Sequence, residues 1–275
     1  MHEPARADPV TATAEVVRPS TASAQATPAE RVLALQQTVG NRAVARMLAA
    51  SAPRVSVARE TTTVQEYVKE ETDTTDNVTW TASFDVEFDE DRKTCWATIK
   101  IQLVPDGGIS TDDVNWTKIG VISRFSLLWD SRYSFDEHRR ILADRDWLFR
   151  PQIEFVDRGG HETVHLHPGK GDSNRTNWYL MKGEINKDDP SKSVPQGYAE
   201  VEHAHEVSHQ MGLLDEYENI HVKDRKVYTD DSLMGDYAHE GYDKVALHAR
   251  HGERMAKIIG RATDRALTSR MIKGE

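Results

Sequence analysis

The residues best suited to chemistry lie in one short stretch, HEVSHQMGLLDEY, which runs from His205 to Tyr217. On a helix, residues four apart lie one turn above each other on the same face, so the imidazoles of His205 and His209 can bind one ion. Glu206 lies beside the first histidine and can hold a water molecule on that ion without binding the ion itself. This spacing predicts a metal site that activates water for attack on a carbonyl group.

A catalytic zinc ion needs a third protein ligand and an open fourth position. Gly212 stands three residues after His209, where a helix can end with a left-handed residue and let the chain turn back toward the ion. Asp215 follows six residues after His209, and its neighbour Glu216 is the rival ligand. The sequence therefore offers two adjacent carboxylates for the third position.

The pattern H-E-x-x-H-x-x-G-x-x-D resembles the signature of the metzincin zinc metallopeptidases, H-E-x-x-H-x-x-G-x-x-[HD], whose last position supplies the third ligand. The aspartate makes the stretch more similar to the snapalysin type than to the commoner histidine type. The resemblance implies that Asp215 joins His205 and His209 in binding Zn²⁺, and that Glu206 acts as general base and then as acid. These ligand types are also compatible with manganese or iron.

A second stretch, DDSLMGDY from Asp230 to Tyr237, resembles the methionine turn that lies beneath the metzincin site. The resemblance implies that Met234 forms a hydrophobic floor under the metal. The family often has a tyrosine two residues after this methionine, whereas Tyr237 follows by three. Tyr237 and Tyr217 both stay candidates for an oxyanion-side donor or for a hydrogen bond behind the ligands. The two motifs together cover roughly the C-terminal half of the chain.

Several other histidines are weaker candidates for metal binding. His203 is expected to face away from the motif pair, toward solvent or a hydrogen-bond partner. His165 and His167 share one face of a predicted strand and could bind a metal, but without an evident third ligand a polar sheet face is favoured. His248 and His251 follow the methionine turn and are expected at the surface or hydrogen-bonded behind the ligands.

Composition limits the class of protein. The net charge of the 275 residues is −10 and no basic stripe carries interleaved aromatic residues, so nucleic acid is a poor candidate partner. No apolar run is long enough to span a bilayer. The single cysteine, Cys95, excludes an internal disulfide and lies in an alternating apolar run that predicts burial. The acidic pair Asp188 and Asp189 is interpreted as solvated charge, with calcium binding as the alternative.

The N-terminal region, residues 1–50, has a different character. Its first ~25 residues are rich in Ala, Thr, Pro and Ser, which predicts disorder. A short helical hairpin is predicted to follow from Thr27, with apolar stripes on each side of Gly40-Asn41. It could simply pack on the main domain. Yet LQQTVGNRAVARML, Leu35 to Leu48, resembles segments near the N-termini of bacterial proteins associated with extracellular contractile injection systems.

This second resemblance implies an effector that is loaded in the bacterial cytoplasm and then delivered outside the cell or into a target cell. The particle of the injection system would be a partner of the N-terminal segment. Such a route would also account for a chain start that lacks the basic and apolar regions of an ordinary secretory signal.

The rest of the chain predicts an α+β fold. Residues 51–77 are interpreted as a linker with one strand-like piece, Thr63 to Val68, and residues 78–275 as the metallopeptidase domain, a mixed sheet over the active-site helix. In metzincins an edge strand pairs with the substrate backbone, so Thr163–His167 or Trp178–Met181 is expected to do so. The predicted elements are strands at Trp80–Phe88 and Cys95–Leu103 joined by a loop at Asp89–Lys93, a helix at Val114–Trp129, and short strands around Ile153–Phe155, Val164–Leu166 and Trp178–Met181.

From these observations we expect a zinc-dependent endopeptidase that acts on a protein or peptide substrate and serves as an effector toxin of a contractile injection system. The alternative is a non-enzymatic adaptor of that system, in which zinc only stabilises the fold. A third possibility is a peptidase that cleaves its own linker.

Overall fold

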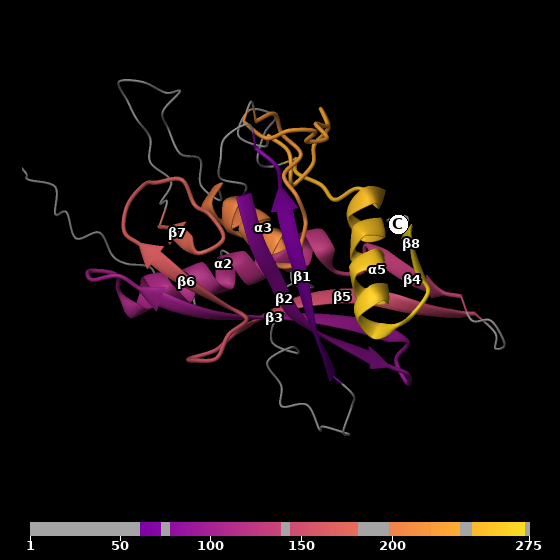
Figure 1. Ribbon diagram of the computed structural model, residues 1–275. Coiled ribbons are helices and arrows are strands. Elements are labelled where there is room, and N and C mark those ends of the chain that lie inside the picture. Colours follow the sequence, from indigo (N-terminus) through magenta and orange to yellow (C-terminus); the bar gives the residue numbers. More distant parts are fainter. Residues whose placement is uncertain are drawn as a thin grey trace, which may run out of the picture.

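The computed structural model describes residues 61–72, 78–138, 144–180, 198–219, 221–236 and 244–272. Within these ranges the chain forms an α+β fold, in which an eight-stranded mixed sheet curls beside three helices (Figure 1). The expected α+β class is therefore confirmed. The predicted N-terminal hairpin, Asp188-Asp189 and Tyr237 lie outside the described residues.

Three antiparallel strands begin the sheet: β1 (Thr61–Glu70), β2 (Val78–Asp89) and β3 (Thr94–Pro105). Alternate residues of β2 and β3 are buried, as their apolar periodicity predicts, and Cys95 is fully buried among them. β1 pairs with β2 over its whole length. The expected linker, residues 51–77, was therefore wrong in part, because from Thr61 onward it contributes a complete strand rather than a short strand-like piece.

The other half of the sheet is built on β3, which pairs in parallel with β5 (Arg145–Phe155). β5 is followed outward by β4 (Tyr133–Glu137) and β8 (Leu267–Met271), both antiparallel. The predicted helix is α2 (Thr111–Trp129), which begins with a reciprocal capping box between Ser110 and Asp113. Its buried face packs into the core, where Trp129 meets Phe149 of β5 edge to face.

β6 (Glu162–His167) pairs on one side with the last residues of β3 and on the other with β7 (Asn177–Tyr179). The expectation that Thr163–His167 is a free edge was therefore wrong in part, because β7 covers it from His165 to His167. The expectation that Trp178–Met181 forms an edge strand is closer to the structure. Among the described strands β7 pairs only with β6, although it ends at Tyr179.

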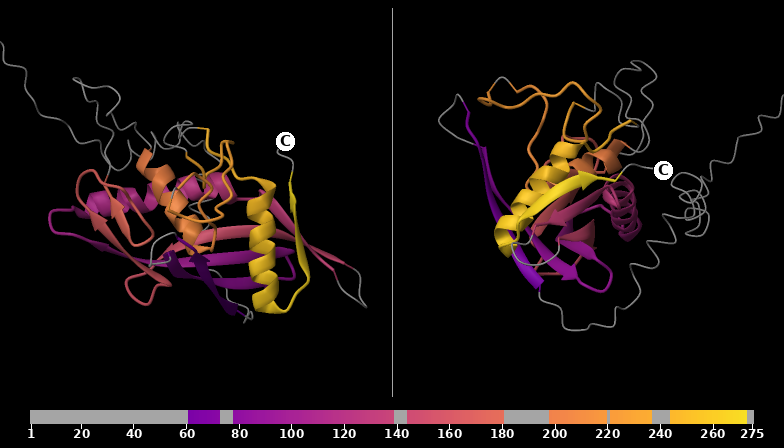
Figure 2. Two further views of the ribbon diagram at one scale, coloured as in Figure 1. Left: turned by 45° about the horizontal axis from the view of Figure 1, so that its top comes forward. Right: turned by 90° about the vertical axis from the view of Figure 1, so that its right-hand side faces the viewer.

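Two more helices complete the fold. α3 (Tyr198–Gln210) packs against α2 and β2, and α5 (Ala249–Thr263) packs against β1 and β8. Figure 2 shows β1 and β2 turning up beside these helices, so that the sheet partly encloses α3. No helix among the described residues is long and apolar enough to cross a membrane.

Candidate metal centre

The helix that carries the histidine pair is buried on all sides. Every residue from Val201 to Gln210 is buried, so each polar side chain there needs a partner inside the protein. Ser208 illustrates this, because its hydroxyl donates to the carbonyl of Ala204 at 2.9 Å and accepts the Trp129 indole N–H at 3.2 Å. His205, Glu206 and His209 instead direct their ligand atoms to within 4.8 Å of one another, and this buried group could hold a metal ion.

The end of α3 turns the chain back toward this group. Gly212 has a φ of +93°, which is the left-handed conformation that favours glycine. Its N–H donates to the carbonyl of His209 at 2.8 Å, and the N–H of Leu213 donates to the carbonyl of Ser208 at 3.2 Å. These two bonds form the helix-terminating motif in which a left-handed residue satisfies the last carbonyls. The predicted role of Gly212 is confirmed.

Backbone carbonyls fix the orientation of both imidazoles. Nδ1 of His205 lies 2.8 Å from the carbonyl oxygen of Leu233, and Nδ1 of His209 lies 2.8 Å from that of Leu213. Because a carbonyl oxygen can only accept, each Nδ1 carries the hydrogen. In the neutral rings, each Nε2 therefore keeps a lone pair for a ligand.

These two lone pairs point at each other and at one carboxylate oxygen. The Nε2 atoms of His205 and His209 are 3.0 Å apart. Oδ1 of Asp215 lies 3.2 Å from Nε2 of His205 and 3.0 Å from Nε2 of His209. This oxygen is buried and makes no hydrogen bond with a described residue. Ligands at ~2.0–2.1 Å around a tetrahedral ion are about 3.3 Å apart, close to the three separations. The donor set thus fits a small divalent cation.

The charges of the group are strongly coupled. Burial favours a neutral His205 ring, but Asp215 and Glu206 outweigh it and raise the pKa of His205 to about 9. Burial would likewise raise the pKa of Asp215, yet His209 and His205 hold it well below the usual range. The cluster therefore attracts positive charge at the point where the three atoms meet, and a proton and a metal ion compete for the same lone pairs.

Glu206 lies at the side of this meeting point. Its Oε1 is 3.9 Å from Nε2 of His205, farther than Asp215 Oδ1. Burial raises the pKa of Glu206, while the two histidines oppose that rise. A carboxyl group beside a cation site can exchange a proton with a water molecule bound there.

The rival carboxylate, Glu216, is occupied elsewhere. Arg250 donates two hydrogen bonds of 2.7 Å to its carboxylate, and Ser232 and His251 also form hydrogen bonds with it. Although burial would raise the pKa of Glu216, the bonds from His251 and Arg250 lower it to about 2. Of the two adjacent carboxylates, Asp215 is the one that the structure brings to the histidines.

The predicted methionine turn lies against the same group. Met234 is fully buried, its N–H donates to the hydroxyl of Ser232 at 3.1 Å, and its carbonyl accepts the N–H of Glu216 at 2.8 Å. The preceding residue, Leu233, supplies the carbonyl that orients His205. The turn thus connects the first histidine to the segment that follows the second.

Tyr217 lies over Arg225, with the guanidinium carbon 5.1 Å from the ring centroid. Burial, followed by the charge of Asp215, raises the pKa of Tyr217 to about 12. Arg225 binds both oxygens of Glu70 and lies 3.4 Å from Oδ2 of Asp215. Tyr217 is therefore placed behind Asp215, as a neighbour of the ligand group.

Residues from distant parts of the chain complete the surroundings. The indole N–H of Trp80 donates to the carbonyl of His209 at 3.1 Å, and the Arg175 guanidinium lies 4.2 Å from the Trp80 ring centroid. The charges of Glu206 and Asp215 act on Arg175. Neither Arg175 nor Arg225 belongs to a local motif, so no sequence pattern indicates them, and Trp80 was assigned only to a strand face.

Of the other histidines, His203 departs in part from its expected place, whereas His248 and His251 lie as expected. His203 was expected to face solvent or a hydrogen-bond partner. The solvent-facing position is wrong, because the ring is buried and stacks on the Trp178 ring, with the two centroids 4.7 Å apart. His251 is buried and bonds to Glu216, behind the site, whereas His248 is half-buried and lies 3.0 Å from Asp231.

The pair on β6, His165 and His167, forms the predicted polar face. Their rings are stacked with centroids 6.4 Å apart. His167 uses one nitrogen on Asp106 at 2.6 Å and the other on Asn177 at 2.9 Å, so neither is left for a metal.

The described chain thus combines two oriented imidazoles, an unbonded carboxylate oxygen and a second, displaced carboxyl group. Such a set can bind a cation and move a proton beside it. The comparisons of this chain with family models, with curated proteins and with solved structures found no match.

Proposed function

We propose that the protein is a zinc-dependent endopeptidase in which His205, His209 and Asp215 hold the metal. The observation that supports this most is the convergence of three ligand atoms within 3.2 Å of one another, one of them a buried carboxylate oxygen that makes no hydrogen bond with a described residue. Burying such atoms together is costly unless a cation lies between them. Nitrogen and oxygen ligands with fixed tautomers suit zinc.

When bound, zinc lowers the pKa of a water molecule and polarises a substrate carbonyl. Glu206 then takes the proton of the attacking water at Oε1 and delivers it to the nitrogen of the departing amine. Its place suits both roles, because Oε1 lies 3.9 Å from Nε2 of His205, beside the point where the ligand atoms meet. Leu213 and Leu233 hold the imidazole rings in place through their carbonyls. Met234 closes the underside of the site.

The substrate class and the route of delivery follow from the two sequence resemblances. A protein or peptide is the expected substrate of a metzincin-like site. The segment from Leu35 to Leu48 supports a role as cargo of a contractile injection system, loaded in the producing cell and released outside it. This segment lies outside the described residues, so its docking is proposed on its sequence alone.

The test compares the wild-type protein with Glu206→Gln and Asp215→Ala, using metal content and hydrolysis of an unfolded protein. We expect one zinc ion per wild-type chain, unchanged zinc in Glu206→Gln, and a loss of metal in Asp215→Ala. Removing the proton carrier should lower the hydrolysis rate by about 10²–10⁴-fold. Wild-type protein that cleaves nothing, or a Glu206→Gln variant as active as wild type, would overturn the proposal. Zinc binding without hydrolysis would instead favour the non-enzymatic adaptor.

A further inference from the structure

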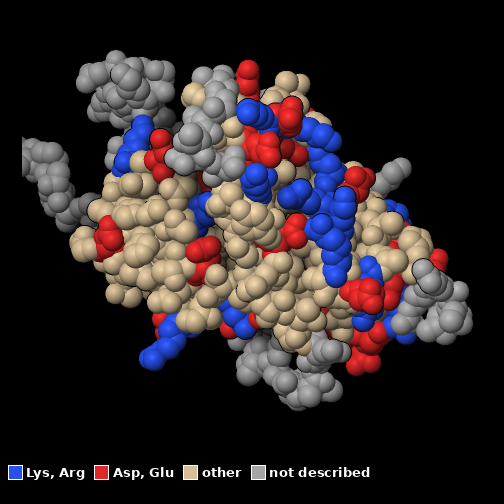
Figure 3. All heavy atoms as spheres, viewed as in Figure 1, with Lys and Arg blue, Asp and Glu red and all other residues tan. Residues whose placement is uncertain are grey.

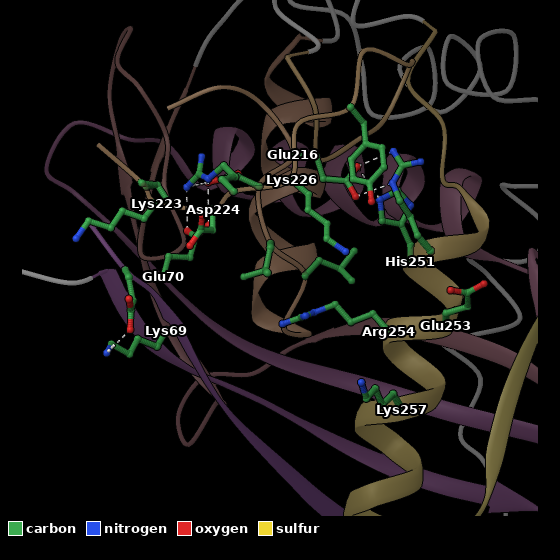
Figure 4. Close-up of a pocket in the computed structure, with 18 residues that line it drawn as sticks. Lys69, Glu70, Glu216, Lys223, Asp224, Lys226, His251, Glu253, Arg254 and Lys257 are labelled. Carbon is green, nitrogen blue, oxygen red and sulfur yellow. Dashed lines mark hydrogen bonds and ion pairs between the residues drawn. The ribbon is translucent and has the colours of Figure 1, made fainter. Parts of the chain in front are cut away.

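A large hollow adjoins the candidate metal centre, and Asp215 is one of the residues that line it. It has a volume of about 620 Å³, within the range of cavities that bind small molecules. The end of β1, residues 213–216, the loop 222–228 and the first half of α5 line it (Figure 4). Although the chain is acidic as a whole, basic side chains gather on the face that Figure 3 shows.

Most carboxylates of the hollow are already neutralised. Arg225 binds Glu70 with two hydrogen bonds, and Arg250 binds Glu216 in the same way. Glu71 pairs with Lys69. Asp224 and Glu253 also line the hollow, and both are exposed to solvent, which screens their charge.

Three basic side chains nevertheless point into the hollow. Figure 4 shows Lys226 reaching in from the loop, and Arg254 and Lys257 from α5. None of the three makes an ion pair with another described residue. Toward the described residues Arg254 donates only its Nε hydrogen, to the carbonyl of Gly212 at 2.6 Å, and burial lowers the pKa of its guanidinium. Like charges that gather around one hollow repel one another, and an anion between them relieves that repulsion.

We propose that this hollow binds a small phosphorylated molecule, with Lys226, Arg254 and Lys257 as the groups that contact its phosphates. Two ammonium groups and a guanidinium fork match a dianionic group with several acceptor oxygens better than they match a single carboxylate. The volume leaves room for a molecule of about the size of a sugar bisphosphate.

Binding there would act on the metal centre, a consequence that rests on the proposed function. Residues 213–216 form one wall of the hollow and carry Asp215, and Arg254 holds the carbonyl of Gly212, where the chain turns toward it. An anion that fixes Arg254 therefore also fixes the segment that presents the third ligand. Binding of the phosphorylated molecule is therefore expected to slow the loss of zinc to a chelator.

The test is calorimetry of the full-length protein with fructose 1,6-bisphosphate, and with neutral fructose as the uncharged comparison. We expect saturable binding of the bisphosphate below about 1 mM and none of fructose. Lys226→Gln combined with Lys257→Gln should weaken binding at least about tenfold, because both lysines are exposed and their loss removes charge without disturbing the core. The matched control is Lys118→Gln with Lys170→Gln, which removes equal charge outside the hollow and should change binding less than about twofold.

Absence of saturable binding, equal binding of fructose, or a double variant at Lys226 and Lys257 that binds like wild type would overturn the proposal. The readout is separate from hydrolysis, so Glu206→Gln is expected to bind the bisphosphate as wild type does. If that variant binds the sugar phosphate and wild type cleaves nothing, the peptidase proposal fails while the anion site stands.

Discussion

His165 and His167 on β6 and His205 and His209 on α3 are two histidine pairs at a spacing that suits a shared ion, but of the two only the α3 pair turns a nitrogen of each ring toward a common point. On β6, His167 has both ring nitrogens in hydrogen bonds to Asp106 and Asn177. On α3, His205 and His209 each use Nδ1 on a backbone carbonyl and turn Nε2 toward the other and toward Asp215. Spacing brings imidazoles to one face in both cases, but the partners of the remaining nitrogens decide what the face can bind.

Substituting one histidine of each pair gives the largest expected effect. His209→Ala should lower zinc affinity at least about a hundredfold and abolish hydrolysis, since one of three ligands is lost. His167→Ala should leave zinc content and hydrolysis unchanged. Elemental analysis after gel filtration, together with a cleavage assay, measures both. Equal metal loss in the two variants would break the distinction between the pairs.

The adjacent carboxylates sharpen the comparison further. Asp215→Asn should weaken metal binding and should also destabilise the metal-free protein, because the carboxylate loses its charge interaction with His205 and His209. Glu216→Gln should leave the zinc content unchanged and lower the free energy of unfolding by about 2–3 kcal/mol, since Arg250 loses its charged partner. Metal content, together with urea unfolding in the presence of a chelator, separates the two variants. A Glu216→Gln variant that loses zinc but keeps its stability would show that Glu216, rather than Asp215, is the metal ligand.

The smallest expected effect concerns the pH dependence of the β6 pair. Hydrogen bonds to Asn177 and then Asp106 raise the pKa of His167 above 6.5. A raised folded-state pKa adds stability that is complete below about pH 6.5 and is lost as the pH rises through the folded value. The side chain is partly exposed, so the contribution should stay under about 1 kcal/mol. Denaturant midpoints of wild type and Asp106→Asn should converge toward high pH, and a constant difference across this range would contradict the assignment.

The elements with long periodic patterns were predictable from the sequence. The alternation in β2 and β3 and the apolar load of α2 placed each element within a few residues. β4 was missed because its five residues, YSFDE, are buried on both faces and show no alternation. β8 has no strong apolar pattern that would predict a strand. β1 is polar enough to resemble a linker, and it forms a strand because it pairs with β2.

The candidate site likewise contains some features that local sequence patterns predict and others that they do not. The histidine spacing, Gly212 and the turn at Met234 are local patterns, so the sequence contains them. The choice between Asp215 and Glu216 depends on Arg250, which lies in a helix more than thirty residues later and captures one of the two. Trp80, Arg175 and Arg225 reach the site only through the folding of distant segments, and no spacing rule indicates such contacts.

The hydrogen bond from His209 to Leu213 joins the candidate ligand to the residue just beyond the helix end. Fraying of this terminus and rotation of the imidazole are therefore a single motion. An ion held at Nε2 would suppress that motion, and the amide of Leu213, bonded to the carbonyl of Ser208, would exchange its hydrogen with solvent more slowly. Amide exchange at one leucine can thus report occupancy of a site in which that leucine is not a ligand.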